Sequence, residues 1–177
     1  MRRLWRINLK QLSQTATLII TLLLTNNTSA DPLFEFKKVG QAKLKVLFWD
    51  IYDSSLYTSN GQYQADIFPQ ALELVYLRDI EADDLIKSTK EEWQKLGIEE
   101  QNSARWLVSL AGILPDIKEG DKLTLVVSDT KQSEFFYNAD SIGVMADPAF
   151  GPDFLRIWLD EKSSHPKLRN KLIGNNK

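Results

Sequence analysis

The chain has 177 residues, of which 43% are hydrophobic and 26% are charged, and its formal net charge is −2. This length suits one globular domain with a substantial core and is short for two. Because the sequence contains no cysteine, disulfides and an acylated lipoprotein cysteine are excluded.

The first thirty residues follow the order of a secretory signal peptide. A basic segment without acids (MRRLWRINLK) precedes a mostly apolar run from Ala16 to Leu24, and small residues lead to Ala30. We predict that residues 1–30 are a signal peptide cleaved after Ala30, and that residues 31–177 form one periplasmic domain. The alternative is a retained membrane anchor, although the apolar run is short for a span of about twenty residues.

Cleavage would also change the charge of the protein. It would remove four basic residues and no acid, so that the mature domain would carry a net charge of −6. We therefore expect no nucleic-acid partner, no affinity for an anionic membrane surface, and no stable membrane anchor after cleavage.

The mature chain opens with predicted strands. Residues 42–50 (AKLKVLFWD) alternate with period two, with the even-numbered residues from Ala42 to Phe48 on one face and the odd-numbered residues on the other. The segment from Ile51 predicts a second, less regular strand that ends at Asn60-Gly61, a strong hairpin signal.

A third strand is predicted at residues 71–79 (ALELVYLRD). After it, the spacing of the apolar residues changes from the period of a strand to that of a helix. Ala82–Leu96 predicts an amphipathic helix with acidic residues in its first turn, near the positive end of the helix dipole. A second helix is predicted through RWLVSLAGIL, with Asn102 or Ser103 as its cap.

The second half of the chain repeats this order. Strands are predicted in KLTLVVSD, EFFYN and SIGVM, the last two joined by a hairpin around Asn138–Asp140. Asp147 is the predicted cap of a helix that we expect to begin near Pro152, since proline disrupts a helix interior. The apolar stripe of this helix is Phe154, Ile157 and Trp158. A final helix is predicted in PKLRNKLI. Strands and helices in separate runs predict an α+β domain with an antiparallel sheet covered by helices.

The sequence lacks the motifs of familiar catalytic and metal centres. His165 is the only histidine, and we interpret it as a turn residue before the last helix. No G-x-S-x-G, dinucleotide-binding glycine motif, Walker lysine or calcium-loop spacing occurs. We therefore predict no catalytic residue set, no metal and no cofactor.

Several segments of the mature chain stand in a distinctive order. They are VGQAKLKVLFWDIYDSSLYT, LRDIEADDLIKSTKEEW, LPDIKEGDKLTL, a short FFYN–IG hairpin and DPAFGPDFLRIWLDEKSSHPKLRNKLIG. This order resembles the chalcone isomerase-like family, particularly its bacterial exported branch, over nearly all of residues 35–174. The resemblance implies an open-faced β-sandwich, in which a large antiparallel sheet is backed by a layer of helices.

The resemblance also implies which positions surround a site. The flavonoid-forming plant enzymes of the family use an arginine on an early strand, a threonine on the next, and a tyrosine and an asparagine on the first helix. By segment order, the threonine position falls at or near Tyr52, and the helix positions fall near Leu85 and Glu92. The early strand offers Lys43 and Lys45 but no arginine. These departures imply a protein without chalcone isomerase activity.

The non-catalytic plant branch of the family binds fatty acids and holds the carboxylate with an arginine and a tyrosine. The resemblance therefore implies a binding protein for a small amphipathic or acyl ligand, with Tyr52 and either Lys43 or Lys45 at the ligand. A lysine would act as a point charge and not as a bidentate fork.

Other interpretations of the same residues stay open. One is an isomerase or lyase that acts on an unknown small substrate through Lys43, Lys45 and Tyr52. Another is an accessory factor that binds a protein partner through its acidic surface. The aromatic residues of 47–57 would then only build the core and a hairpin. An open apolar cleft at Tyr52 would favour the ligand-binding and enzymatic interpretations.

Overall fold

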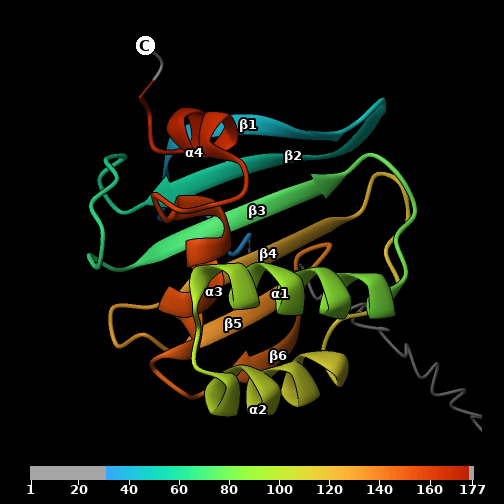
Figure 1. The fold of residues 1–177 in the computed structure, drawn as a ribbon. Helices are drawn as coiled ribbons and strands as arrows, with labels where there is room; N and C mark the ends of the chain where they lie inside the picture. The colour runs from blue at the N-terminus through green and yellow to red at the C-terminus, as the bar shows by residue number, and fades with distance from the viewer. Residues whose placement is uncertain (1–30, 176–177) are drawn as a thin grey trace, which may run out of the picture.

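The computed structural model describes residues 31–175, so the predicted signal peptide and its cleavage point lie outside the described residues. Six strands and four helices follow one another in that part of the chain (Figure 1). The strands are β1 (Lys37–Val46), β2 (Trp49–Thr58), β3 (Gln70–Tyr76), β4 (Lys122–Val127), β5 (Ser133–Tyr137) and β6 (Asp140–Met145). The helices are α1 (Ala82–Leu96), α2 (Glu100–Ala111), α3 (Phe150–Leu159) and α4 (Pro166–Leu172).

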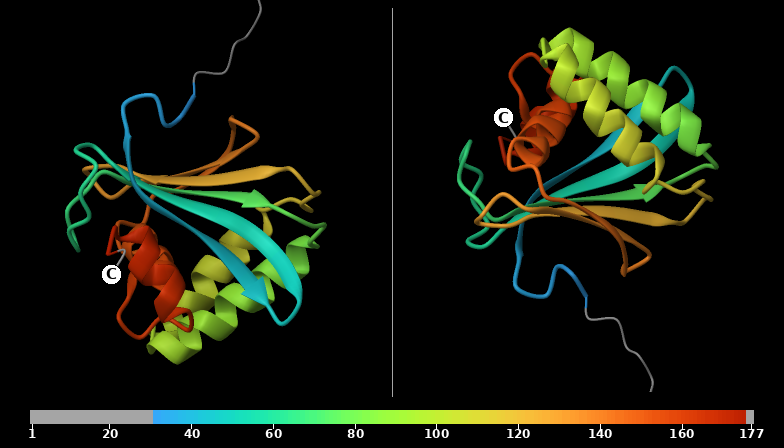
Figure 2. Two further views of the ribbon diagram at one scale, coloured as in Figure 1. Left: turned by 90° about the horizontal axis from the view of Figure 1, so that it is seen from above. Right: turned by 90° about the horizontal axis from the view of Figure 1, so that it is seen from below.

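The six strands form one sheet in chain order, and every neighbouring pair is antiparallel. The helices lie together on one face of this sheet, as the two edge-on views in Figure 2 show. The apolar residues of the strands point to that face, where Leu72, Leu74 and Tyr76 of β3 are all buried. The predicted α+β class and the open-faced sandwich are confirmed.

An aromatic cluster holds three of the helices to the sheet. Trp93 of α1, Trp106 of α2 and Phe150 of α3 meet edge to face, with ring centroids 5.6–6.2 Å apart. Phe135 of β5 completes the cluster from below, 5.9 Å from Phe150. The Trp93 indole also donates a hydrogen bond to the Asp153 carbonyl at 3.1 Å. Rings in this arrangement stabilise the fold beyond their buried area, so this side of the molecule is a filled core.

The first hairpin differs from the prediction. The chain turns at Leu47 and Phe48, and Val46 of β1 pairs with Trp49 of β2. The prediction of one strand over residues 42–50 is therefore wrong. Leu47 has a φ of 54°, a left-handed conformation that leucine seldom adopts. Since no glycine, asparagine or proline marks the turn, the apolar alternation runs through it unbroken.

The first helical pair agrees with the prediction in one helix and departs from it in the other. Helix α1 has the predicted bounds, and Gly97 ends it with a φ of 70°. Helix α2 begins at Glu100 with Glu99 at the N-cap position, so the predicted caps Asn102 and Ser103 are wrong.

Helix α3 begins at Phe150, slightly before the predicted start, with Ala149 at the N-cap position, so the predicted cap Asp147 is wrong. Pro152 then lies in the first turn, where its missing amide has no helical partner to lose. At Gly151 a β-carbon would lie 2.3 Å from the Ser133 hydroxyl oxygen and 2.8 Å from a Val127 methyl group. A residue without a side chain is thus required for the helix to approach the sheet this closely.

Asp147 fixes the entry to α3. One carboxylate oxygen accepts a hydrogen bond from the Ala149 amide at 3.0 Å, and the other accepts from the Trp106 indole at 3.0 Å and from Arg105 at 3.1 Å. The Ala149 amide and the Trp106 indole hold the pKa of Asp147 below its ordinary value of 3.8. Because the folded-state pKa is depressed, the stabilisation is present above about pH 4 and is lost as the pH falls through the folded-state pKa.

We predict that Asp147→Asn lowers the free energy of unfolding at pH 7 by about 1–2 kcal/mol, because a neutral amide is a weaker acceptor. The difference from the unmodified protein should shrink between about pH 5 and pH 2, as measured by denaturant unfolding across that range. Arg105→Ala removes an exposed ion pair and an exposed hydrogen bond to Asn102, so it should cost about 0.5 kcal/mol and keep the acid dependence. A deficit for Asp147→Asn that does not vary with pH would contradict the role of the charge.

Candidate ligand-binding site

A cavity of about 880 Å³ lies between the sheet and helix α1. Known small-molecule sites enclose about 300–1,000 Å³. The walls come from the strands, from α1, from the end of α3 and from the start of α4. The interior is lined mainly by apolar side chains, among them Leu72, Leu74, Leu123, Leu125, Phe135, Phe154 and Leu168. The cavity therefore reaches from the surface into the hydrophobic core.

The uneven spread of the helices over the sheet explains the position of the cavity. Helix α4 packs against β1 and β2, whereas α1 packs against α2 and α3 (Figure 1). Side chains of β2 and β3 line the cavity from the sheet, and the end of α3 lines it from the helical layer. Period-two alternation then decides which side chains of these strands reach the cavity.

Two tyrosines face the cavity from neighbouring strands. Tyr52 of β2 and Tyr76 of β3 are paired across the sheet, with ring centroids 5.7 Å apart. The Tyr52 hydroxyl accepts a hydrogen bond of 2.9 Å from the Trp158 indole, which connects β2 to α3. Burial raises the pKa of both phenols. At neutral pH both hydroxyls are therefore protonated and act as hydrogen-bond donors, not as bases.

Lys43 and Lys45 lie on the other face of β1. Their Nζ atoms pair with Asp50 at 3.0 and 2.9 Å, and Lys43 also lies 3.8 Å from Asp53. The alternation that turns Leu44 toward the cavity turns both lysines away from it. The structure therefore does not bring Tyr52 together with either lysine at this cavity. Of the three residues only Tyr52 lines the cavity, and its contact with a ligand stays a prediction.

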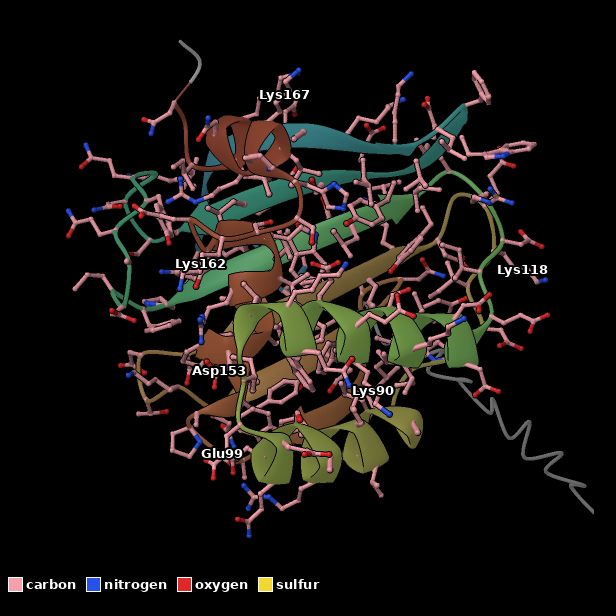
Figure 3. All side chains as sticks on the ribbon, viewed as in Figure 1. Lys90, Glu99, Lys118, Asp153, Lys162 and Lys167 are labelled. Atoms are coloured by element: carbon pink, nitrogen blue, oxygen red, sulfur yellow. The ribbon has the colours of Figure 1, made fainter. Side chains whose placement is uncertain are left out.

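Other basic side chains lie at the rim, namely Arg78, Lys87 and Lys118. Lys118 pairs with Asp79 at 2.9 Å and points outward at one end of the sheet (Figure 3). Arg78 follows Tyr76 by two residues, and its guanidinium carbon lies 4.8 Å from the ring centroid of Trp49. Within residues 31–175, Arg78 forms no ion pair, so its charge is available to a ligand. Arg78 was not among the predicted site residues, because the family resemblance implied a cation on the early strand. Its period-two spacing from Tyr76 was the available signal.

The rim carries more acidic than basic side chains. The acidic residues are Asp79, Glu81, Asp84, Glu91, Glu92 and Asp116. Burial alone would raise the pKa of Glu92, but hydrogen bonds from Lys95 and Ser164 lower it. Leu85 and Glu92, the helix positions singled out by the family resemblance, both line the cavity. The structure thus brings Tyr52 and these two positions to one site with an apolar interior and a charged border.

Residues 31–175 contain neither a metal-binding cluster nor a helix that could span a membrane. No group of three or more histidine, aspartate or glutamate side chains is arranged to hold a metal ion there. None of the helices in this part of the chain combines the length and the apolar character needed to span a bilayer.

Comparison with known proteins identifies the family. The chalcone isomerase-like family model matches residues 37–174, and the chain belongs to this family. An uncharacterized protein of Haemophilus influenzae is 25% identical over 149 residues, which cover 84% of this chain and 73% of that protein. The crystal structure of a fatty-acid binding protein of Arabidopsis thaliana is similar with a TM-score of 0.63 and 11% identity, over 80% of this chain and 88% of that one. At this identity the likeness shows the shared fold alone.

The hydrogen bond between Trp158 and Tyr52 can be tested by a double-mutant cycle. Tyr52→Phe should lower the free energy of unfolding by about 1–3 kcal/mol, because it leaves a buried indole donor without its acceptor. Trp158→Phe also removes buried volume, so it should cost more. The double variant should lose about 1 kcal/mol less than the sum of the two single losses.

Denaturant unfolding at pH 7 measures these losses. Tyr57→Phe is the matched control, because the Tyr57 hydroxyl forms a longer hydrogen bond of 3.3 Å to Glu73, outside the cavity. It should cost less than Tyr52→Phe. Strictly additive losses at Tyr52 and Trp158 would show that the two side chains are not coupled.

Proposed function

We propose that this protein is an exported, periplasmic and non-catalytic binding protein for a small amphipathic ligand such as a fatty acid. The cavity between the sheet and α1 is the observation that carries the proposal, because it joins an apolar interior to a charged rim. Membership of the chalcone isomerase-like family and the shared fold of the plant fatty-acid binding protein support it. Export rests on the composition of residues 1–30.

The apolar chain of such a ligand would lie against the interior of the cavity. Each methylene group transferred there from water contributes about 0.8 kcal/mol to binding. A chain of ordinary acyl length can thus supply most of the affinity without any charged contact. The interior walls carry leucine and phenylalanine side chains, which suit an alkyl chain and provide no specific polar contacts.

The polar end of the ligand would lie near Arg78 and the two tyrosines. Within residues 31–175 the Tyr76 hydroxyl has no hydrogen-bond partner, and the Tyr52 hydroxyl accepts a bond while its own proton has no acceptor. A carboxylate could accept from these protonated phenols and pair with the guanidinium of Arg78. The acidic side chains of α1 would disfavour a carboxylate on the opposite side of the rim, which orients the ligand toward β3.

The cavity also bears on the alternative functions. An accessory factor that binds only a protein partner needs no internal space of this size. An isomerase or lyase that uses Lys43 and Lys45 would need both lysines at the cavity, yet they pair with Asp50 on the other face of β1. Ligand binding is therefore the function that the geometry supports best.

We predict that delipidated protein binds palmitate and that Arg78→Ala weakens this binding roughly tenfold to a hundredfold, the loss expected for one charge-assisted contact. Fluorescence displacement measures the dissociation constant. Arg105→Ala is the matched control, because Arg105 is an exposed arginine that pairs with Asp147 and lies outside the cavity. It should leave palmitate binding unchanged.

Methyl palmitate separates the charge of the ligand from its chain. Its binding should be equal in the unmodified protein and in Arg78→Ala, since the ester has no carboxylate for the guanidinium. Native mass spectrometry of protein purified from periplasm should show bound lipid or fatty acid. Delipidated protein that binds neither palmitate nor its ester at micromolar concentration would overturn the proposed function.

A further inference from the structure

The turn between β1 and β2 carries a cluster of exposed apolar side chains. Leu47 is 87% exposed, Phe48 is 97% exposed and Trp49 is 61% exposed, and Val46 beside them is half-exposed. We call Val46–Trp49 the hairpin tip. The other exposed large hydrophobic residues in the described part of the chain stand apart in the sequence: Phe34, Ile67, Val108 and Val144. A contiguous apolar surface of this kind marks an interaction site.

The hairpin tip is continuous with the rim of the cavity. Figure 2 shows that the β1–β2 hairpin curls toward the face of the sheet that carries the helices. Val46 belongs both to the tip and to the cavity wall, and Arg78 on the rim lies over the ring of Trp49. A surface that contacts the tip would therefore lie next to the opening through which a ligand enters.

The charges of β1 and β2 beside the tip cancel one another. Lys43 and Lys45 share Asp50, and Lys43 also lies near Asp53, so two positive charges face two negative ones. Arg78 over Trp49 adds a single cation, which gives a strongly charged partner of either sign little net attraction. An uncharged or zwitterionic apolar phase fits this composition better than an acidic protein, a nucleic acid or an anionic membrane.

The size and shape of the tip favour a lipid bilayer over a protein. A large aromatic side chain buries about 150–250 Å², so the tip offers roughly 500 Å² of apolar surface. A stable protein interface needs about 800 Å² on each partner. The tip is the narrow end of a two-stranded hairpin, which can enter a fluid phase but presents no flat face. Tryptophan beside a basic side chain, as in Trp49 and Arg78, is the combination found at membrane–water interfaces.

The backbone of the turn adds a second argument. Leu47 holds a left-handed conformation, with a φ of 54°, in which glycine or asparagine would be less strained. The Leu47 side chain points into solvent and therefore stabilises neither the core nor the sheet. It could be buried only by an apolar partner outside the molecule.

We propose that the hairpin tip inserts into the outer layer of a zwitterionic lipid bilayer and places the cavity mouth at the membrane surface. An amphipathic ligand then passes between the bilayer and the cavity without crossing bulk water. This passage rests on the proposed ligand-binding function, whereas the insertion of the tip does not. The two are therefore tested by separate measurements.

Because the sequence contains no cysteine, a single engineered cysteine carries a fluorophore at one site only. Phe48→Cys in protein purified from periplasm, labelled with an environment-sensitive dye, should show a blue shift and a severalfold rise in emission when phosphatidylcholine vesicles are added. Spin-labelled lipids in the same vesicles should quench it. Val108→Cys is the matched control, because Val108 is 77% exposed on α2. Its emission should not change.

Three outcomes would overturn insertion of the tip. The first is no change at Phe48→Cys with phosphatidylcholine vesicles. The second is a change with phosphatidylglycerol vesicles only, because charge and not apolar contact would then hold the protein. The third is emission that is already blue-shifted without vesicles, because protein and not lipid would then cover the tip.

Transfer of the ligand is tested with Leu47→Asn combined with Phe48→Ser. This double variant should slow the transfer of a fluorescent fatty acid from phosphatidylcholine vesicles to the protein at least tenfold. Its affinity for the same fatty acid in solution should be unchanged, since neither side chain lines the cavity. An unchanged transfer rate would overturn the passage from the bilayer. If the unmodified protein does not bind the fatty acid in solution, the proposed function is overturned, whereas the insertion of the hairpin tip into vesicles is not affected.

Discussion

The hydrogen bond from the Trp158 indole to the Tyr52 hydroxyl joins the helical layer to the sheet where the filled core ends and the cavity begins. On one side, the ring centroids of Phe154 and Trp158 lie 5.5 Å apart, and Phe154 also stacks on Phe150 of the aromatic cluster. On the other side, Tyr52 meets Tyr76 in the cavity wall. Since a buried indole without an acceptor is costly, α3 cannot shift along the sheet without a loss of stability. The core thus determines where the wall of the binding site stands.

Much of the fold could be predicted because the spacing of apolar residues and the residues that end helices indicated the same elements. Helix α1 combines a regular apolar stripe with Gly97 at its end, and β3 alternates cleanly through Leu72, Leu74 and Tyr76. The turn at Leu47 and Phe48 could not be found in this way, since its residues continue the apolar pattern of the strand. A turn made of apolar residues gives no local signal, and only the pairing of Val46 with Trp49 reveals it.

The candidate site was predictable in part. Family resemblance led to Tyr52, Leu85 and Glu92, which all line the cavity. Lys43 and Lys45 were predicted beside Tyr52 because the family resemblance implied a cation on the early strand. The period-two alternation of β1 places both lysines on the face opposite Leu44 and Val46, which line the cavity. Arg78 lies two residues beyond the end of β3, and its period-two spacing from Tyr76 was the only sequence signal that pointed to it.

The chain order of the sheet bears on how the molecule folds. Each strand pairs with the next strand in the sequence, and four of the five antiparallel pairings join strands that are separated only by a loop, whereas α1 and α2 lie between β3 and β4. Short loops lose little entropy on closure, and local pairings of this kind form early. The bond between Trp158 and Tyr52 joins residues 106 positions apart and must wait until almost the whole domain has been assembled. We therefore expect the binding cavity to be the last part of the molecule to take shape.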